Sequence, residues 1–246
     1  MKILFLTEFF WPYVGGAERL GARLAEDLQR HGHELLVVTS HDQLNLPDEE
    51  NYCGIPIRRF VFRDTLKSGD PAGVLALRKR VAELIDSFSP DLIHLYQLGI
   101  SAFFQLDTLC NYPAPLIVSL HNDLYPSQLR EKNSLFLRLF HAAAWITSCS
   151  QSALDQTLEL APELGNKASL IHNGFELPAV SPVAYPENTQ RLLCLGRLVS
   201  EKGFDIALRG LSNITGQFPG VRMTIAGDGP ERAALEELAG GKAEAS

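Results

Sequence analysis

The residues with the clearest chemical potential stand at the end of one apolar run. The run 192–195 ends in Gly196 and Arg197, and Lys202 precedes a helical pattern that starts at Phe204. Arg offers a planar fork of donors and Lys a mobile point charge, and a helix N-terminus adds free N–H groups, so this spacing predicts a site for a phosphate group. The alternative is an exposed turn that carries two solvated cations.

Two glycines and a histidine mark a second candidate site near the start of the chain. Gly15 and Gly16 separate the apolar run 3–6 from a helical pattern, and His121 follows the run 116–120. Glycines at such a turn let a phosphate or a sugar approach the backbone, whereas the alternative is a tight turn that needs positive φ. His121 is either a functional group or a strand-end residue that a neighbouring carbonyl satisfies. A full Gly-x-Gly-x-x-Gly is absent, which disfavours a nicotinamide cofactor.

Composition narrows the class of partner. The chain has 246 residues and a formal net charge of −7, which disfavours binding to a nucleic-acid backbone. Its 4 cysteines are far apart and indicate neither disulfides nor a zinc site. The apolar run 3–6 is too short for a signal peptide or a membrane span, so we expect a cytoplasmic protein.

The elements that must position these residues alternate between strand and helix patterns. This alternation predicts an α/β fold with a doubly wound parallel sheet. Residues 41–54 read as a polar connection, and Pro56 indicates that the strand 55–62 lies at the edge of the sheet. The expected strands are 3–6, 35–38, 55–62, 92–95, 116–120, 145–147 and 169–171, and the expected helices start at 17 or cover 74–88, 99–110 and 151–160.

A change of composition divides the chain. Residues 175–190 contain Pro178, Pro182 and Pro186 without a helical period, so we expect a linker between a first domain, residues 1–174, and a second, residues 191–246. The second domain is expected to contain strands at 192–195 and 221–226 and helices at 204–218 and 231–239.

Five short motifs in a fixed order carry a family resemblance. They are Gly15-Gly16-Ala17-Glu18, His121, Asn173-Gly174, Gly196-Arg197 with Glu201-Lys202-Gly203, and Gly227-Asp228-Gly229-Pro230. Together they resemble the family 4 retaining glycosyltransferases of the GT-B fold. The resemblance implies two facing Rossmann-like domains and a nucleotide-sugar donor, a UDP-sugar or a GDP-sugar, held mainly by the second domain.

The resemblance also implies roles for single residues. Arg197 and Lys202 are expected to bind the donor diphosphate, Gly15 and Gly16 to let the first domain approach it, and His121 to act as the catalytic residue beside the donor sugar. Fixed cations would stabilise the charge that develops on the leaving phosphate. The sequence has no Asp-x-Asp, so neither a metal site nor a cofactor is expected.

One departure from the family pattern concerns the second domain. Family members carry a Glu-x7-Glu segment well after the Gly-Asp-Gly-Pro turn, and this chain ends before it. The chain therefore resembles a family member that lacks most of its C-terminal domain, with an incomplete second Rossmann-like domain, and we expect it to be inactive alone. The alternatives are a truncated, non-catalytic binding module of the same fold and, on weaker grounds, a sugar-nucleotide epimerase.

The acceptor stays open between a glycan, a lipid-linked substrate and a small molecule. The segment 130–140 combines basic residues with an apolar background. It could seat a peripheral helix on an anionic membrane at the inner face, and the alternative is an amphipathic helix that packs on the sheet.

Overall fold

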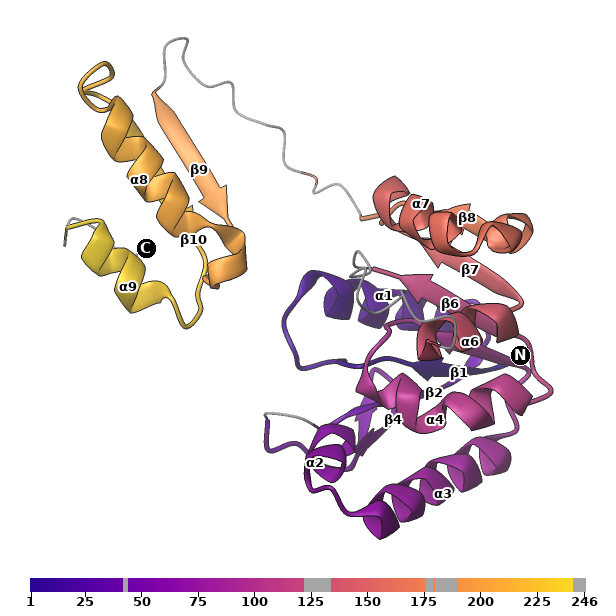
Figure 1. Ribbon diagram of the computed structural model, residues 1–246. Helices are drawn as coiled ribbons and strands as arrows, with labels where there is room; N and C mark the ends of the chain where they lie inside the picture. The colour runs from indigo at the N-terminus through magenta and orange to yellow at the C-terminus, as the bar shows by residue number, and fades with distance from the viewer. Residues whose placement is uncertain (42–43, 122–133, 176–178, 180–189, 241–246) are drawn as a thin grey trace. The chain divides into compact units, whose positions relative to one another are not determined.

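Figure 1 shows the computed structural model, which describes residues 1–41, 44–121, 134–175, 179 and 190–240. The chain forms two compact units, Met1–Leu177 (unit 1) and Pro178–Ser246 (unit 2). The expected linker, residues 175–190, lies almost entirely outside the described residues.

Unit 1 is built on a sheet that, among the described residues, has eight strands in the order β3-β4-β2-β1-β5-β6-β7-β8. Every neighbouring pair is parallel except β3 with β4. The predicted parallel α/β fold is therefore confirmed. The strands are β1 (Lys2–Leu6), β2 (Glu34–Ser40), β3 (Glu49–Tyr52), β4 (Ile55–Phe60), β5 (Leu92–Leu95), β6 (Leu116–Leu120), β7 (Trp145–Ser148) and β8 (Ala168–Leu170).

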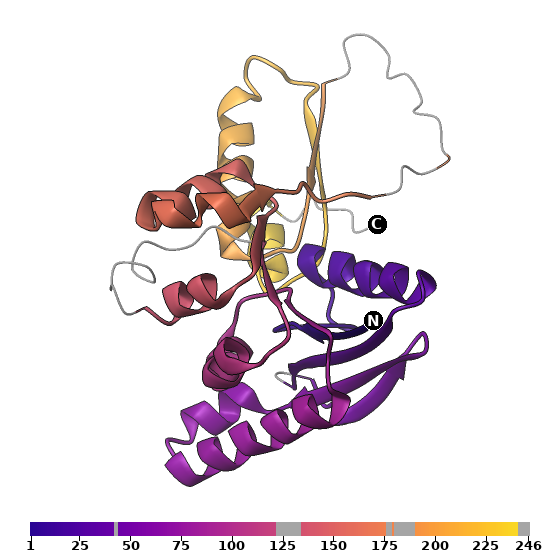
Figure 2. The same cartoon turned by 90° about the vertical axis from the view of Figure 1, so that its right-hand side faces the viewer.

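Helices cover both faces of this sheet, as Figures 1 and 2 show from two directions. The helix α1 packs on one face and the helices α3 and α4 on the other. The helices are α1 (Gly16–Arg30), α2 (Phe62–Lys67), α3 (Pro71–Phe88), α4 (Ile100–Asn111), α6 (Leu135–Ala142) and α7 (Gln151–Leu160), with the 3-10 helix η1 (Pro162–Lys167).

The two covered faces explain why β1 is apolar at every position from Ile3 to Leu6. Ile3 and Phe5 of β1 belong to the cluster beneath α1, while Leu4 and Leu6 belong to the cluster beneath α3 and α4. Successive side chains of a strand point to opposite faces, so covering both faces of β1 favours an uninterrupted apolar run.

The region around Pro56 differs from the expectation in two respects. Residues within the expected polar connection form β3, which pairs with β4 and takes its place at the edge of the sheet. Cys53 and Gly54 join the two strands with φ values of 51° and 90°, the positive values of a two-residue hairpin turn. β4 also ends at Phe60, because Phe62 already begins α2. Edge placement of β4 was therefore wrong: Pro56 lies opposite Asn51, and the ladder with β2 starts only at Ile57.

Unit 2 is a smaller α/β element in which β9 and β10 run parallel. Three residues, Leu198, Phe204 and Leu235, form its buried centre. α8 ends at Ile214, four residues before the expected end. The elements are β9 (Arg191–Leu195), the 3-10 helix η2 (Ser200–Lys202), α8 (Phe204–Ile214), β10 (Arg222–Ala226) and α9 (Arg232–Leu238).

Candidate functional site

His121 directly follows β6, at the carboxyl ends of the parallel strands. The ring of Tyr96, which follows β5, lies 4.2 Å from the His121 ring between centroids. Both ring nitrogens of His121 are buried, and no described residue offers them a hydrogen bond. The alternative expectation is that a neighbouring carbonyl satisfies His121. Among the described residues, no carbonyl does so.

The protonation state of His121 follows from its surroundings. Burial lowers the pKa of His121, and the negative charge of Glu18 opposes this shift in part. A lowered pKa keeps the imidazole neutral at neutral pH, so that one nitrogen donates and the other accepts. The side chain can thus offer two complementary hydrogen bonds to a ligand that carries hydroxyl groups.

A second histidine lies on the neighbouring strand. His94 of β5 has one ring nitrogen, Nε2, 2.8 Å from the hydroxyl of Ser119, which in turn lies 2.8 Å from the hydroxyl of Thr147. Burial, with a smaller effect from His121, lowers the pKa of His94 to about 4. His94 is therefore neutral and held by a row of hydroxyl groups, whereas no described residue offers His121 such a partner.

Gly15 and Gly16 lie at the N-terminus of α1. The loop that leads to them leaves the carboxyl end of β1, which is the end of the parallel sheet where His121 also lies. Gly15 has φ −164° and ψ 169°, so the predicted alternative of a turn with positive φ is wrong. A Cβ at Gly15 would collide with the carboxylate of Glu18, which folds back over it, whereas a Cβ at Gly16 would meet nothing within 4 Å. Gly16 is exposed, and its open surroundings leave the first turn of α1 accessible.

α1 approaches the sheet closely near His121. A Cβ at Gly21 would lie 2.7 Å from the ring of Tyr96, so only glycine allows this packing without a shift. The same Tyr96 ring contacts His121, and burial raises the pKa of Tyr96, with smaller effects from Cys149 and Glu18. The sequence does not indicate that Glu18 and Tyr96 are neighbours of His121, because their proximity depends on how α1 packs against Tyr96 beyond the end of β5.

Arg197 and Lys202 lie in one loop of unit 2, between β9 and α8. Both side chains are exposed, and neither forms an ion pair within the described part of the chain. Lys202 ends η2, and Gly203, with φ 65°, connects it to α8 in the left-handed conformation that favours glycine. The expected order of strand, turn and helix start is present, with a short 3-10 helix inserted.

The Gly-Asp-Gly-Pro turn supports the loop that carries Arg197. The amide of Leu198 donates to the carbonyl of Asp228 at 2.8 Å, and the carbonyl of Leu198 accepts from Glu231 at 3.0 Å. A Cβ at Gly227 would collide with the carbonyl oxygen of Gly196, and one at Gly229 with the backbone of Leu198. The two glycines therefore permit a close backbone contact that fixes the residues on both sides of Arg197.

The structure thus groups the predicted site residues in two sets. Gly15, Gly16 and His121 lie in unit 1, where Glu18 connects the helix start with the histidine electrostatically. Arg197 and Lys202 lie together in unit 2. Their assigned roles stay predictions.

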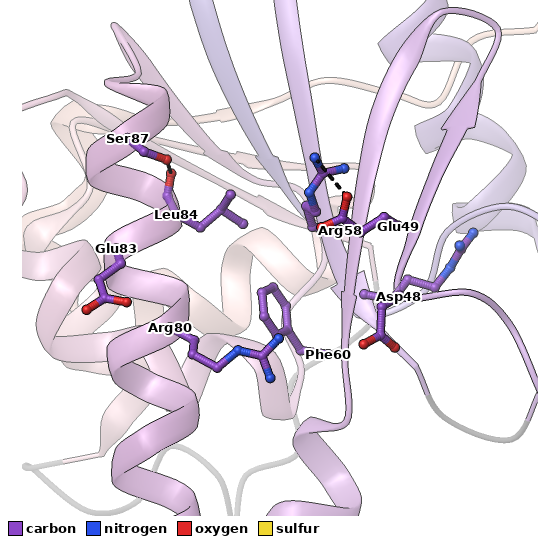
Figure 3. Close-up of a pocket in the computed structure, with 9 residues that line it drawn as sticks. Asp48, Glu49, Arg58, Phe60, Arg80, Glu83, Leu84 and Ser87 are labelled. Atoms are coloured by element: carbon purple, nitrogen blue, oxygen red, sulfur yellow. Dashed lines mark hydrogen bonds and ion pairs between the residues drawn. The ribbon is translucent and has the colours of Figure 1, made fainter.

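A surface cavity of about 370 Å³ lies elsewhere in unit 1, between β4 and α3 (Figure 3). Arg58 lies 3.3 Å from the carboxylate of Glu49, and the Arg80 guanidinium lies 5.6 Å from the centre of the Phe60 ring. Acidic and basic residues line it together, so the cavity shows no preference for an anion. It contains none of the predicted site residues.

The predicted membrane segment is described only in part. Arg130 and Lys132 lie outside the described residues, and Arg138 donates to the carboxylate of Asp107 on α4 at 2.9 Å. Leu139 and Phe140 of α6 are buried in the core. Contact with a membrane stays a prediction. In the described part of the chain, no helix combines the length and the apolar character needed to cross a bilayer.

Acidic, histidine and cysteine side chains are the common protein ligands of metal ions. The described residues contain no group of three or more of them placed to hold a metal ion.

Comparison with known sequences identifies relatives. The profile of the family described as Glycosyltransferase Family 4 matches residues 14–177. Sulfoquinovosyl transferase SQD2 of Arabidopsis thaliana is 26% identical over 96% of this chain and 48% of its own length. A GDP-mannose-dependent alpha-mannosyltransferase of Corynebacterium glutamicum is 25% identical over 97% of this chain and 60% of its own length. The chain therefore spans about half of the curated relatives that it matches.

Solved structures share the fold. The catalytic domain of starch synthase IV from Arabidopsis thaliana, bound to ADP and acarbose, superposes with a TM-score of 0.59 at 16% identity. The match covers 97% of this chain and 70% of that one. At this identity the likeness establishes the fold alone, which is the GT-B fold that the motifs predict.

Proposed function

The chain belongs to glycosyltransferase family 4, and on that premise we propose that it serves the transfer of a sugar from a nucleotide-diphosphate donor to an acceptor. The transfer is proposed to retain the configuration at the anomeric carbon, as the resemblance implies. The observation that carries the proposal is the pair Arg197 and Lys202, two exposed cations in one loop with no carboxylate partner among the described residues.

The chemistry of the transfer fits this pair. When the sugar leaves, negative charge grows on the diphosphate oxygen while the anomeric carbon becomes cationic. Cations that are already fixed near that oxygen stabilise the transition state more than the ground state. Arg197 would bind two phosphate oxygens with its planar fork, and Lys202 would add a point charge.

His121 is proposed to lie beside the donor sugar. A neutral imidazole with two buried and unsatisfied nitrogens suits a ligand with several hydroxyl groups. The N-terminus of α1, open at Gly16, would face the diphosphate. We propose a UDP-sugar or GDP-sugar donor, and a relative named for GDP-mannose supports the second of these.

The acceptor and the location of the protein stay predictions. The acceptor is proposed to be a glycan, a lipid-linked substrate or a small molecule. A cytoplasmic location with peripheral contact at the inner membrane face is likewise proposed on the sequence alone.

Sugar transfer tests the proposal directly. Radiolabelled UDP-glucose and GDP-mannose are incubated with glycan, lipid-linked and small-molecule acceptors, using the 246-residue chain and a version extended through a complete second domain. We expect transfer by the extended version and little by the chain alone, because unit 2 leaves one strand face uncovered, with Leu193 70% and Leu195 78% exposed. Nucleotide binding without any transfer by either version would instead support the binding-module alternative.

A further inference from the structure

The loop that joins β1 to α1, residues 7–15, determines where the N-terminus of α1 lies. Its first residues are fixed to the neighbouring strand β2. The backbone oxygen of Glu8 accepts hydrogen bonds from the amide of Ser40 at 3.1 Å and from the hydroxyl of Thr39 at 3.2 Å. The amide of Phe9 donates to the side-chain oxygen of Gln97 at 3.2 Å, and the residues that follow Phe9 in the loop have a further support.

Arg59 of β4 supplies that support. Its side chain has an exposed fraction of 0%. One guanidinium nitrogen donates to the backbone oxygen of Trp11 in the loop at 2.8 Å. The second terminal nitrogen, Nη1, donates to the backbone oxygen of Pro47 at 3.1 Å and to the carboxylate of Glu50 at 2.7 Å. A single buried cation thus ties the loop to the β3–β4 hairpin.

The hairpin holds the same region through aromatic contacts. The ring of Tyr52 lies 5.5 Å from that of Phe10 and 5.4 Å from that of Trp11, measured between centroids. The hydroxyl of Tyr52 donates to the carboxylate of Glu26 on α1 at 2.6 Å. The β3–β4 hairpin therefore contacts both the loop and the helix that the loop leads into.

We propose that Arg59 is a positioning residue, which holds the β1–α1 loop so that Gly15 and Gly16 present the start of α1 to the donor. The assignment of these glycines rests on the proposed function. Arg59 touches no substrate in this account and acts through the loop. The role requires a planar fork, because its acceptors lie in two directions and the single ammonium of lysine cannot reach them together.

The preceding residue offers a matched control. Arg58 lies on the same strand, but successive side chains of a strand point to opposite faces. Its guanidinium is 3.3 Å from the carboxylate of Glu49, beside the cavity in Figure 3, and no described contact links it to the β1–α1 loop. Arg58→Lys thus repeats the chemical change of Arg59→Lys without touching the loop.

Local hydrogen exchange is the test, performed on the full chain. The protein has 2 tryptophans, so a Trp145→Phe background makes Trp11 the only fluorophore of its kind. In Arg59→Lys, the amides of Phe9 and Tyr13, which donate to the side chain of Gln97 and to the backbone oxygen of Phe10, should exchange about ten- to a hundredfold faster, as expected when a hydrogen bond to a charged group is lost. Acrylamide should also quench Trp11 more strongly, while exchange in α3 stays unchanged.

The control and a second variant decide how the result is interpreted. Arg58→Lys should leave both the loop and Trp11 unchanged. If Arg59→Lys does not fold, Glu50→Gln, which removes only the counter-charge, should accelerate exchange of the loop by a smaller factor. An unchanged loop in the Arg59 variant, or an equal acceleration in Arg58→Lys, overturns the proposal.

Titration with UDP and GDP separates this proposal from the proposed function. If neither the starting protein nor the version extended through a complete second domain binds a nucleotide, but the loop of Arg59→Lys loosens, the proposed function fails and the anchoring of the loop stands. If nucleotides bind the starting protein and Arg59→Lys equally well despite a loosened loop, the proposed function stands and the positioning role fails.

Discussion

Two strands of similar sequence, one in each unit, differ in how far their side chains are buried. In β1 of unit 1, Leu4 and Phe5 are both 0% exposed, because helices cover both faces of the sheet. In β9 of unit 2, Leu193 and Leu195 are 70% and 78% exposed, while Cys194 between them packs on the buried centre. One face of β9 is therefore covered and the other is open.

This difference shows that an apolar run predicts a strand but does not predict whether other elements bury both of its faces. Residues 3–6 and 192–195 have the same character in the sequence. Burial depends on how many elements surround the strand: α8 and α9 contribute the buried Phe204 and Leu235 on one side of β9 only. The exposed apolar face makes unit 2 the part of the described structure with less stabilisation from burial.

The largest effect should come from truncating one strand leucine to alanine in each unit. Leu4→Ala should lower the free energy of unfolding by about 2–5 kcal/mol, because it leaves a cavity in a closed core. Leu193→Ala should change it by no more than about 0.5 kcal/mol, since the side chain is largely in water. Urea denaturation, followed by tryptophan fluorescence for unit 1 and by circular dichroism for the whole chain, measures both. Equal losses would contradict the contrast in burial.

The buried histidine of unit 1 predicts a pH dependence that unit 2 should lack. His94 has a folded-state pKa of about 4, against an ordinary value of 6.5. Between these values the unfolded chain binds the proton more readily, so stability is full above pH 6.5 and is lost as the pH falls toward 4. From pH 7.5 to 4.5 the loss attributable to His94 should be about 2–3 kcal/mol.

Denaturation of the starting protein and of His94→Gln at both pH values isolates this term. Other groups titrate equally in the two proteins, so the variant should lose less stability on acidification. The same loss in both would show that His94 is not the group responsible.

Within unit 2, two glycines should respond with opposite signs. Gly227→Ala should destabilise by about 1–3 kcal/mol, since its Cβ would collide with Gly196 and its φ is 157°. Gly210 lies in α8 with nothing within 4 Å of a Cβ, so Gly210→Ala should stabilise by about 0.5–1 kcal/mol. Thermal unfolding followed by circular dichroism compares them. Destabilisation by both would mean that unit 2 tolerates no added side chain, whatever the local space.

Much of the fold could be predicted because local patterns determine it. The strands 92–95 and 116–120 and the helix 151–160 match the structure residue for residue, and the side chain of Ser150 caps this helix by accepting from the amide of Ala153 at 3.1 Å. The β3–β4 hairpin escaped prediction because its turn uses Cys53 with Gly54, and cysteine gives little signal for positive φ. The helix α8 likewise ended earlier than its apolar pattern suggested.

The candidate site shows the same difference between what local patterns determine and what long-range contacts determine. The placement of Arg197 and Lys202 follows from a local succession of strand, turn and helix, which the sequence displays. The group of Tyr96, Glu18 and His121 depends on contacts between segments far apart in the chain. The anchoring of the β1–α1 loop by Arg59 is of the same kind, and no pattern in the sequence points to it.

Calorimetric titration of the full chain with UDP and GDP tests the central claim, a diphosphate site at Arg197 and Lys202. Arg197→Ala and Lys202→Ala should each weaken binding by roughly ten- to a hundredfold, the effect of losing one hydrogen bond to a charged group. Arg209→Ala serves as the control, because this exposed cation of α8 lies 3.9 Å from the carboxylate of Asp205. The account predicts that the control binds like the unaltered chain. Undiminished binding by both site variants, or an equal loss in the Arg209 control, would contradict it.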